Sequence, residues 1–168
     1  MNRFSIKATH SLDSMQKLTV FELWNNEYPQ QLVHERITDF ENYLSHLIAT
    51  KHYLLYDENE AIIGWGIIFL RDSEQWFALL IDSRFQGMGL GTFLLNELKK
   101  TQPILNGWVI DHENDLKQNG KPYLSPLAFY KKNNFEVLGN FRIENEKISA
   151  VKIKWHSDLL LLLVLQQK

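Results

Sequence analysis

A dense run of glycines is the clearest chemical signal in this 168-residue chain. Three of its eight glycines, Gly87, Gly89 and Gly91, fall within five positions. The run follows an apolar segment that ends at Ile81 and precedes the apolar spacing of a helix. A loop without side chains lets an anion approach the backbone, and the free N–H groups of a helix's first turn point toward it. Residues 86–92 are therefore predicted to hold a phosphate group.

Two common phosphate-binding patterns do not fit this segment. A P-loop ends in Gly-Lys-Ser/Thr, whereas Gly91 is followed directly by Thr92 without the lysine. The dinucleotide fingerprint requires a third glycine at position 92. The segment does match the pattern Gln/Arg-x-x-Gly-x-Gly/Ala, through Gln86, Gly89 and Gly91. A nucleotide-hydrolysing or dinucleotide-binding protein is therefore not expected.

The wider segment resembles the signature of the GNAT superfamily of acyl-CoA-dependent N-acyltransferases, hydrophobic-Asp-Pro-x-x-Arg/Gln-Gly-x-Gly-x-Gly. Here it reads Ile81-Asp82-Ser83-Arg84-Phe85-Gln86-Gly87-Met88-Gly89-Leu90-Gly91, with Ser83 in place of the proline. A second stretch, residues 127–135, is similar to the family's Leu/Phe-Tyr-x-x-x-Gly-Phe motif, with Asn134 in place of glycine. The resemblance extends from about Phe4 to Trp155.

The resemblance implies a site for acetyl-CoA as co-substrate. The backbone of the strand at residues 79–81, including Leu80 and Ile81, would pair with the pantetheine amides. The pyrophosphate would be held by the segment that follows, Gln86, Gly87, Met88, Gly89, Leu90, Gly91 and Thr92. Tyr130 would face the thioester sulfur as general acid, because a phenol of pKa about 10 can donate a proton to a departing thiolate.

A base is also needed, because an acceptor amine with a pKa near 10 must lose a proton before it attacks. The strand preceding Asp111 and His112 should end beside the thioester, so these two residues are the first candidates. Glu113 and Glu74 are further candidates, and a water chain is another. The simpler interpretation of this acidic loop is a solvated surface. The remaining histidines show no i, i+4 pairing suited to a metal, and no metal is expected.

The other assignments also have structural alternatives. The glycine run could be only a tight strand-to-helix turn, and Tyr130 could be a packed amphipathic side chain. Trp24 precedes an amide-rich connection at residues 25–37, so it could belong to the core or line an acceptor pocket.

Apolar spacing predicts the elements that position these residues. Their order is strand, two helices, three strands, helix, strand, helix and two strands. The predicted segments are 4–8, 12–28, 38–48, 52–56, 61–70, 76–81, 90–100, 107–110, 125–133, 135–141 and 149–156. A Thr38-x-x-Glu41 capping box should begin the second helix, and Leu12, Met15, Leu18 and Phe21 should form the apolar face of the first. Ser125 should cap the last helix, and Asn133-Asn134 should end it.

This order matches the GNAT fold. We therefore expect one α/β (α+β) domain at residues 1–156, with a mixed, mostly antiparallel central sheet flanked by helices. A composition of 45% hydrophobic and 23% charged residues is typical of one globular domain. The apolar tail at residues 157–168 contains seven consecutive apolar residues, Leu159 to Leu165. It should pack on its own domain or on a second copy, so a homodimer is one predicted assembly.

Composition also limits compartment and partners. The formal net charge of -2 gives no electrostatic drive toward nucleic acid. The absence of cysteine excludes a disulfide framework and a thiolate nucleophile. No stretch approaches the roughly 20 apolar residues that span a bilayer, so we expect a cytoplasmic protein without a membrane partner.

The expected function is transfer of an acyl group, most simply acetyl, from CoA to a primary amine by direct attack. No cysteine is present to carry a covalent acyl intermediate. The alternative is a non-catalytic acyl-CoA-binding or regulatory module with the same fold. The acceptor stays open at this stage: polyamine, aminoglycoside, amino acid, peptide N-terminus or lysine side chain.

Overall fold

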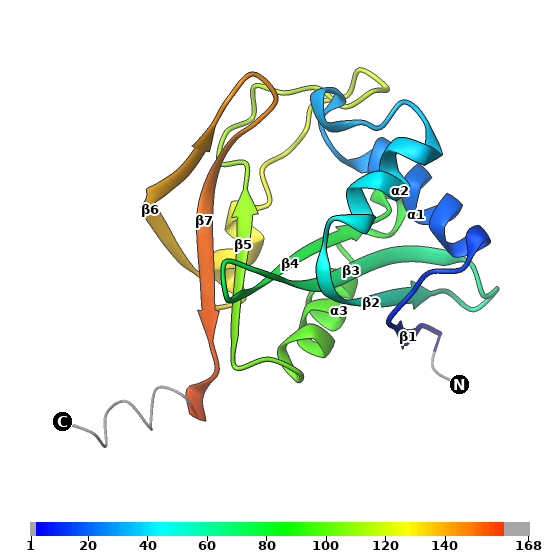
Figure 1. Ribbon diagram of the computed structural model, residues 1–168, viewed down its shortest axis with the longest axis horizontal. Helices are drawn as coiled ribbons and strands as arrows, with labels where there is room; N and C mark the ends of the chain where they lie inside the picture. The colour runs from blue at the N-terminus through cyan, green and yellow to red at the C-terminus, as the bar shows by residue number, and fades with distance from the viewer. Residues whose placement is uncertain (1–2, 160–168) are drawn as a thin grey trace.

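The computed structural model describes residues 3–159, which form a single sheet with helices on both faces (Figure 1). The strands are β1 (Ser5–Thr9), β2 (Ile48–Tyr56), β3 (Ile62–Arg71), β4 (Glu74–Ile81), β5 (Ile104–Val109), β6 (Glu136–Glu144) and β7 (Ser149–His156). The helices are α1 (Ser14–Glu27), α2 (Ile37–Ser45), α3 (Leu90–Lys99) and α4 (Leu127–Lys132), with short 3-10 turns η1 (Gln30–Leu32) and η2 (Ser83–Phe85). The predicted order of elements and the mixed, mostly antiparallel sheet are confirmed.

The sheet order is β1-β2-β3-β4-β5-β7-β6, and every neighbouring pair is antiparallel except β4 and β5. Parallel strands need a crossover connection, which α3 provides here. β4 and β5 share one register pair, Trp76 with Asn106, and then separate (Figure 1). The edge of β4 that faces β5 is therefore without a strand partner from Phe77 to Ile81.

Alternating side chains of β4 divide the core into two layers. Phe77 and Ile81 belong to the cluster under α3 and α4. Trp76 and Leu80 belong to the cluster under α1 and α2 on the opposite face. Because the free edge of β4 lies between these layers, a ligand seated there is accessible from both faces.

The buried face of α1 differs from the predicted one. Asp13 caps the helix by accepting the N–H of Gln16 at 2.8 Å. Met15 and Leu18 are 72% and 40% exposed, so their predicted burial was wrong. Tertiary packing instead buries the side of α1 that carries Trp24, the largest side chain of the helix.

The start and end of α2 also differ from prediction. The N-cap is Arg36, whose backbone N–H donates to the carboxylate of Asp39 at 3.1 Å, so the predicted Thr38-x-x-Glu41 box does not form the cap. The helix ends at Ser45, and Ile48 is already the first residue of β2, paired with Leu70. Backbone pairing with β3 therefore overrides the helical spacing that extended to residue 48.

The last helix begins close to the predicted position. Pro126 occupies the cap position, but the hydroxyl of Ser125 still accepts the N–H of Leu127 at 3.2 Å and donates to the carbonyl of Ile110 at 2.7 Å. Asn134 has the predicted left-handed conformation, with φ of 65°. Of the apolar tail, residues 160–168 lie outside the described residues, so its packing stays a prediction. Within residues 3–159, no helix has the length and apolar composition needed to cross a membrane.

Candidate active site

The turn between β4 and α3 is closed by side-chain hydrogen bonds. The amide of Gln86 donates to the carbonyl of Ile81 at 2.9 Å. The carboxylate of Asp82 accepts the backbone N–H of Arg84 at 2.9 Å, and hydrogen bonds from that arginine hold the pKa of Asp82 below its usual value. These contacts give the turn a fixed shape without any bound group.

The glycines of the turn leave its backbone accessible. Gly87 and Gly89 have φ of 77° and 79°, where a side chain is strained, and no atom lies within 4 Å of a Cβ built on either one. None of the backbone N–H groups from Gln86 to Thr92 donates a hydrogen bond within residues 3–159. These free donors lie at the positive end of α3, which is an arrangement that suits a phosphate.

Gly91 has a different role from the other two glycines. A Cβ at this position would lie 3.1 Å from the ring of Phe129 in α4. The missing side chain lets α4 pack closely on the first turn of α3. This packing places the neighbouring Tyr130 on the same side of the sheet as the turn.

Tyr130 is buried among aromatic rings. Its ring centroid lies 5.6 Å from that of Phe77, on β4, and 5.0 Å from that of Phe129. Burial first, and Tyr123 second, raise the pKa of its hydroxyl, which forms no hydrogen bond within residues 3–159. The phenol therefore stays protonated at neutral pH, with its proton available to a ligand.

The free edge of β4 leads from Tyr130's neighbour Phe77 toward the turn. Its other edge is fully paired with β3, as in the register pairs Trp65 with Leu80 and Gly64 with Ile81. An extended ligand with amide groups can add to such an edge as an extra strand. The free edge, the turn and Tyr130 together form a path for an extended ligand that has amides along its length and phosphate at its end.

The predicted base Asp111 is engaged in a strong ion pair. Its two carboxylate oxygens accept from the guanidinium of Arg142 at 2.8 and 3.0 Å. These bonds lower the pKa of Asp111, so its carboxylate is a weak base. Glu74, a further predicted base and the first residue of β4, is similarly paired with Lys152 at 2.8 Å.

The predicted base His112 is held by its own loop. Its Nδ1 accepts the backbone N–H of Asn114 at 3.2 Å, and its Nε2 lies 3.9 Å from Asp115. In the neutral ring, Nε2 must then carry the proton, so neither nitrogen has a free lone pair. Neither His112 nor Asp111 is hydrogen-bonded to Tyr130. Glu113 is exposed on the same loop.

The sequence interpretation did not single out Glu27, which connects two parts of the site. Its carboxylate is 6% exposed, accepts the backbone N–H of Ser83 at 2.8 Å, and lies 2.7 Å from the ammonium of Lys117. A proline at position 83, as in the family signature, would have no N–H to donate. The helical spacing of Glu27 with Val20 and Trp24 places it on the buried face, a signal that could have indicated its role.

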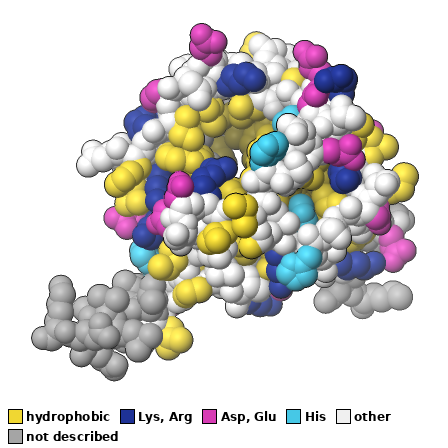
Figure 2. Space-filling view, viewed as in Figure 1, with side chains coloured by type: hydrophobic (Ala, Val, Ile, Leu, Met, Phe, Trp, Pro, Cys, Tyr) yellow, Lys and Arg dark blue, Asp and Glu magenta, His cyan; other side chains and the backbone are white. Residues whose placement is uncertain are grey.

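The tryptophans on this face are packed: Trp24 and Trp76 are buried, and Trp108 is half-buried. Trp24 is 8% exposed and donates its indole N–H to the carbonyl of Leu32 at 2.8 Å, so it is a core residue that holds the α1–α2 connection. Trp76 and Trp108 stack with centroids 5.2 Å apart. Figure 2 shows a hollow on this side of the molecule, with hydrophobic side chains inside it and lysine or arginine side chains near its margin.

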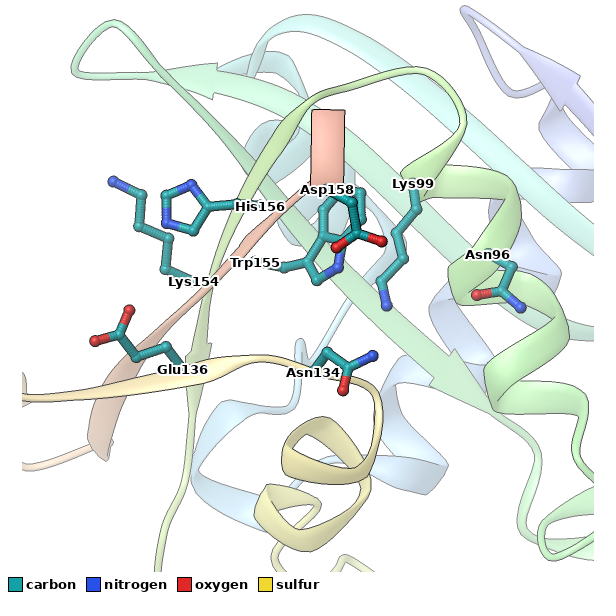
Figure 3. Close-up of a pocket in the computed structure, with 8 residues that line it drawn as sticks. All are labelled: Asn96, Lys99, Asn134, Glu136, Lys154, Trp155, His156 and Asp158. Carbon is teal, nitrogen blue, oxygen red and sulfur yellow. The ribbon is translucent and has the colours of Figure 1, made fainter. Parts of the chain in front are cut away.

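A cavity of about 370 Å³ opens elsewhere, at the C-terminal end of α3 (Figure 3). Its walls are mostly polar and come from α3, β6, β7 and their flanking residues: Asn96, Lys99, Asn134, Glu136, Lys154, Trp155, His156 and Asp158. None of the predicted site residues lines it. The turn lies at the other end of α3, so this cavity is separate from the candidate site.

Comparisons with known proteins agree on one family. A family model described as an acetyltransferase (GNAT) domain matches residues 49–137, more than half of the chain. An aminoglycoside 6'-N-acetyltransferase with coenzyme A is 12% identical and has a TM-score of 0.68, over 90% of this chain and 96% of that one. A Vibrio cholerae spermidine N-acetyltransferase with CoA and spermine is 16% identical, with a TM-score of 0.66, over 96% and 99%. A Sinorhizobium meliloti phosphinothricin acetyltransferase with AcCoA is 10% identical, with a TM-score of 0.64, over 92% and 88%. No curated protein sequence matches the chain.

Proposed function

Because the chain belongs to the acetyltransferase (GNAT) family, we propose that it transfers acetyl from acetyl-CoA to a primary amine of a small molecule by direct attack. One observation carries the proposal: the unpaired edge of β4 continues into a turn whose N–H groups from Gln86 to Thr92 have no partner in the described chain. Both features suit one extended ligand with amides and a pyrophosphate.

In this proposal, the backbone of Leu80 and Ile81 pairs with the pantetheine arm. The free N–H groups of the turn, with the dipole of α3 behind them, bind the pyrophosphate. The two left-handed glycines, Gly87 and Gly89, allow the phosphate oxygens to approach the backbone closely. This arrangement fixes the thioester along β4, on the side where Tyr130 packs against Phe77.

The amine nitrogen then forms a bond with the thioester carbonyl carbon, and the carbon–sulfur bond breaks. Tyr130 donates to the departing thiolate. Because burial raises its pKa, the phenol is a weaker acid than tyrosine in water but is fully protonated at neutral pH. The protonated amine loses one proton to His112 or to water before it attacks, and the nitrogen loses a second proton as the carbon–sulfur bond breaks, which balances the proton that Tyr130 gives to the thiolate. His112 must first release the N–H of Asn114, whereas Asp111 would have to leave two charged hydrogen bonds, so His112 is the preferred base.

The named activities of the structural neighbours support a small acceptor. They act on an aminoglycoside, on spermidine and on phosphinothricin, according to their descriptions. At 10 to 16% identity these neighbours share only the fold with this chain. The identity of the acceptor therefore has to be inferred from the residues of this chain's own site.

The test is the release of CoA thiol from acetyl-CoA by the full-length protein with a panel of amines. The acetylated amine is identified by mass, and reactions without amine serve as the control for hydrolysis. Steady, amine-dependent thiol release supports the enzyme. Tight acetyl-CoA binding with no release across the panel would favour the non-catalytic binding module instead.

A further inference from the structure

Arg71 ends β3 beside Trp76, which belongs to the core cluster under α1 and α2. Its guanidinium lies 5.0 Å from the ring centre of Phe69 and 5.4 Å from that of Trp76. The residue is half-buried, and its guanidinium forms no ion pair or hydrogen bond within residues 3–159. Guanidinium stays charged at every physiological pH and carries five N–H donors. Arg71 is therefore a permanent charge without a counterion in the described chain.

The neighbouring charges do not supply that counterion. Asp72, at the exposed hairpin tip, forms no ion pair with Arg71, and Glu74 lies 2.8 Å from Lys152 and 3.9 Å from Lys154. Lys152 also lies over the ring of Trp76, at 4.9 Å. Two lysines thus share one carboxylate, and Arg71 adds a further positive charge. The region around Trp76 has an excess of positive charge.

Three other acids of the described chain are already paired with arginine. Asp111 and Glu144 both pair with Arg142, at 2.8 and 2.7 Å. Asp39, on α2, pairs with Arg36 at 2.9 Å. A polycationic acceptor would therefore meet unpaired positive charge around Trp76 and no free carboxylate among these acids, which is unfavourable.

The same charges lie next to the free edge of β4. Trp76 is the last β4 residue paired with β5, and beyond it the edge is open. Its indole stacks on Trp108 and touches both cations, Arg71 and Lys152. Trp76 is itself only 4% exposed, so a flat or apolar body would contact the half-buried Trp108, with Arg71 near one end and the open edge of β4 near the other.

We propose that the acceptor is an amine that also carries an anionic group such as a carboxylate, bound by Arg71, with an apolar body on Trp108. This inference rests on the proposed function, since the open edge of β4 is taken as the position of the thioester. It assigns Arg71 as a residue that determines acceptor specificity.

The first test compares matched acceptors. One pair is 4-(aminomethyl)benzoate and 4-(aminomethyl)benzamide, and a second is L-phenylalanine and its primary amide, with spermidine as the polycation. The carboxylate of each pair should have a kcat/KM about 10- to 100-fold higher than its amide, the typical effect of a charge-assisted hydrogen bond. A preference for the amides or for spermidine would overturn the inference.

The second test removes the charge. Arg71→Met keeps the length of the side chain, and should lower kcat/KM for the carboxylate acceptors to the level of the amides without changing the amides. Arg71→Lys should keep part of the preference. Arg3→Met is the matched control, because Arg3 also lies over a ring, that of Phe4 at 5.6 Å, but beside β1 at the far edge of the sheet. Equal losses for carboxylates and amides in Arg71→Met would contradict the assignment.

A binding measurement separates this inference from the proposed function. 3-Phenylpropionate and 3-phenylpropionamide, which have no amine, are titrated into the protein with CoA present and followed by tryptophan fluorescence. Wild type should bind the carboxylate about 10-fold more tightly or better, and Arg71→Met should lose that difference. This result without any turnover would show a carboxylate-binding site at Arg71 but reject the enzyme, and with it the assignment of that site to an acceptor. No difference between the two compounds would reject the inference while leaving acetyl transfer intact.

Discussion

The two sides of the candidate site differ in how their residues are distributed along the sequence. Most of the donor side, residues 77–99, is one continuous stretch: the open part of β4, the glycine turn and α3, with Tyr130 of α4 packed beside it. The acceptor side combines segments that are far apart in sequence: the end of α1 meets the β5–α4 connection through Glu27 and Lys117, and the tip of the β3–β4 hairpin meets β7 through Glu74 and Lys152. A continuous stretch can keep a recognisable spacing of residues, whereas an assembled surface has none.

The two sides also bind through different groups. The donor side offers backbone N–H groups and a strand edge, which depend on φ and ψ more than on side-chain identity. In the proposed function the acceptor side would bind through side chains, among them Arg71 and Trp108. Substitutions should therefore affect the two sides separately, and the variants below are chosen to test that separation.

The largest effect is expected for Gly89→Glu. A carboxylate at this position enters the space left for the pyrophosphate and repels it, so acetyl-CoA affinity should fall by at least about three orders of magnitude, measured by titration calorimetry. Gly120→Glu is a matched control: Gly120 has the same φ of 79° and equally open surroundings, but lies in the β5–α4 connection. If Gly89→Glu folds and binds acetyl-CoA as the wild type does, the glycine segment is only a turn.

Tyr130→Phe should separate chemistry from binding on the donor side. It keeps the ring that packs on Phe77 but removes the proton donor, so turnover should fall about 10² to 10⁴ fold with little change in acetyl-CoA affinity. Tyr53→Phe is the control, since that hydroxyl bonds to Thr101 at 3.0 Å under α3 instead. Wild-type turnover by Tyr130→Phe with a good acceptor would show that the thiolate leaves without this proton.

Glu27→Gln should weaken the connection between the two sides. The amide can still accept the N–H of Ser83 but leaves the ammonium of Lys117, 14% exposed, without its partner. The free energy of unfolding in urea should fall by about 3 kcal/mol. Adding Lys117→Met should restore most of it, because the pair is then replaced by uncharged groups. An unchanged free energy of unfolding in the single variant would mean that the ion pair does not hold the loop.

The last effect, no larger than that of Glu27→Gln and confined to low pH, concerns His52 in β2, which belongs to neither side. Its Nδ1 accepts the indole N–H of Trp65 at 3.1 Å, and burial, with a smaller effect of His10, lowers its pKa from 6.5 to about 4. The unfolded chain therefore binds a proton below pH 6.5 that the folded chain does not. Stability is full above pH 6.5 and should fall by up to about 3 kcal/mol as the pH drops toward 4.

His52→Gln should flatten that decline in thermal or urea unfolding, since the amide keeps an acceptor for Trp65 without titrating. If His52→Gln abolishes a loss of activity in this pH range, that loss is caused by unfolding of the whole domain. If the loss of activity persists in His52→Gln, it is caused by the titration of a group in the site itself. An equally steep decline of stability in His52→Gln would exclude His52 as its source.

The sequence predicts most of the fold because local signals and tertiary pairing agree there. The alternation of apolar residues in β4 matches the two core layers on either side of the sheet, and the helical spacing after Gly91 matches the face of α3 that packs on the sheet. They disagree in two places. α1 turns Met15 to solvent in order to bury Trp24, and β2 takes Ile48 from the predicted second helix. In both, contacts with distant residues outweigh local spacing.

The donor side of the site is predictable for the same reason, since its residues keep a fixed spacing. The acceptor side is not. Glu27 and Lys117 lie ninety positions apart, and nothing local indicates that they meet. Arg71 follows a run of apolar residues and reads as a strand end at a solvated hairpin. Its importance follows from the missing partner, which only the folded arrangement of charges reveals.

The carboxylate of Glu27 bonds at once to the donor-side turn and to the acceptor-side loop, and this has a thermodynamic consequence. If either ligand moves its own segment, the change in Glu27's contacts alters the free energy of the other segment as well. Such coupling is reciprocal by necessity: whatever factor acetyl-CoA contributes to acceptor affinity, the acceptor contributes to acetyl-CoA affinity. With a proline at position 83 the N–H would be missing, and the two binding equilibria would lose this route of communication.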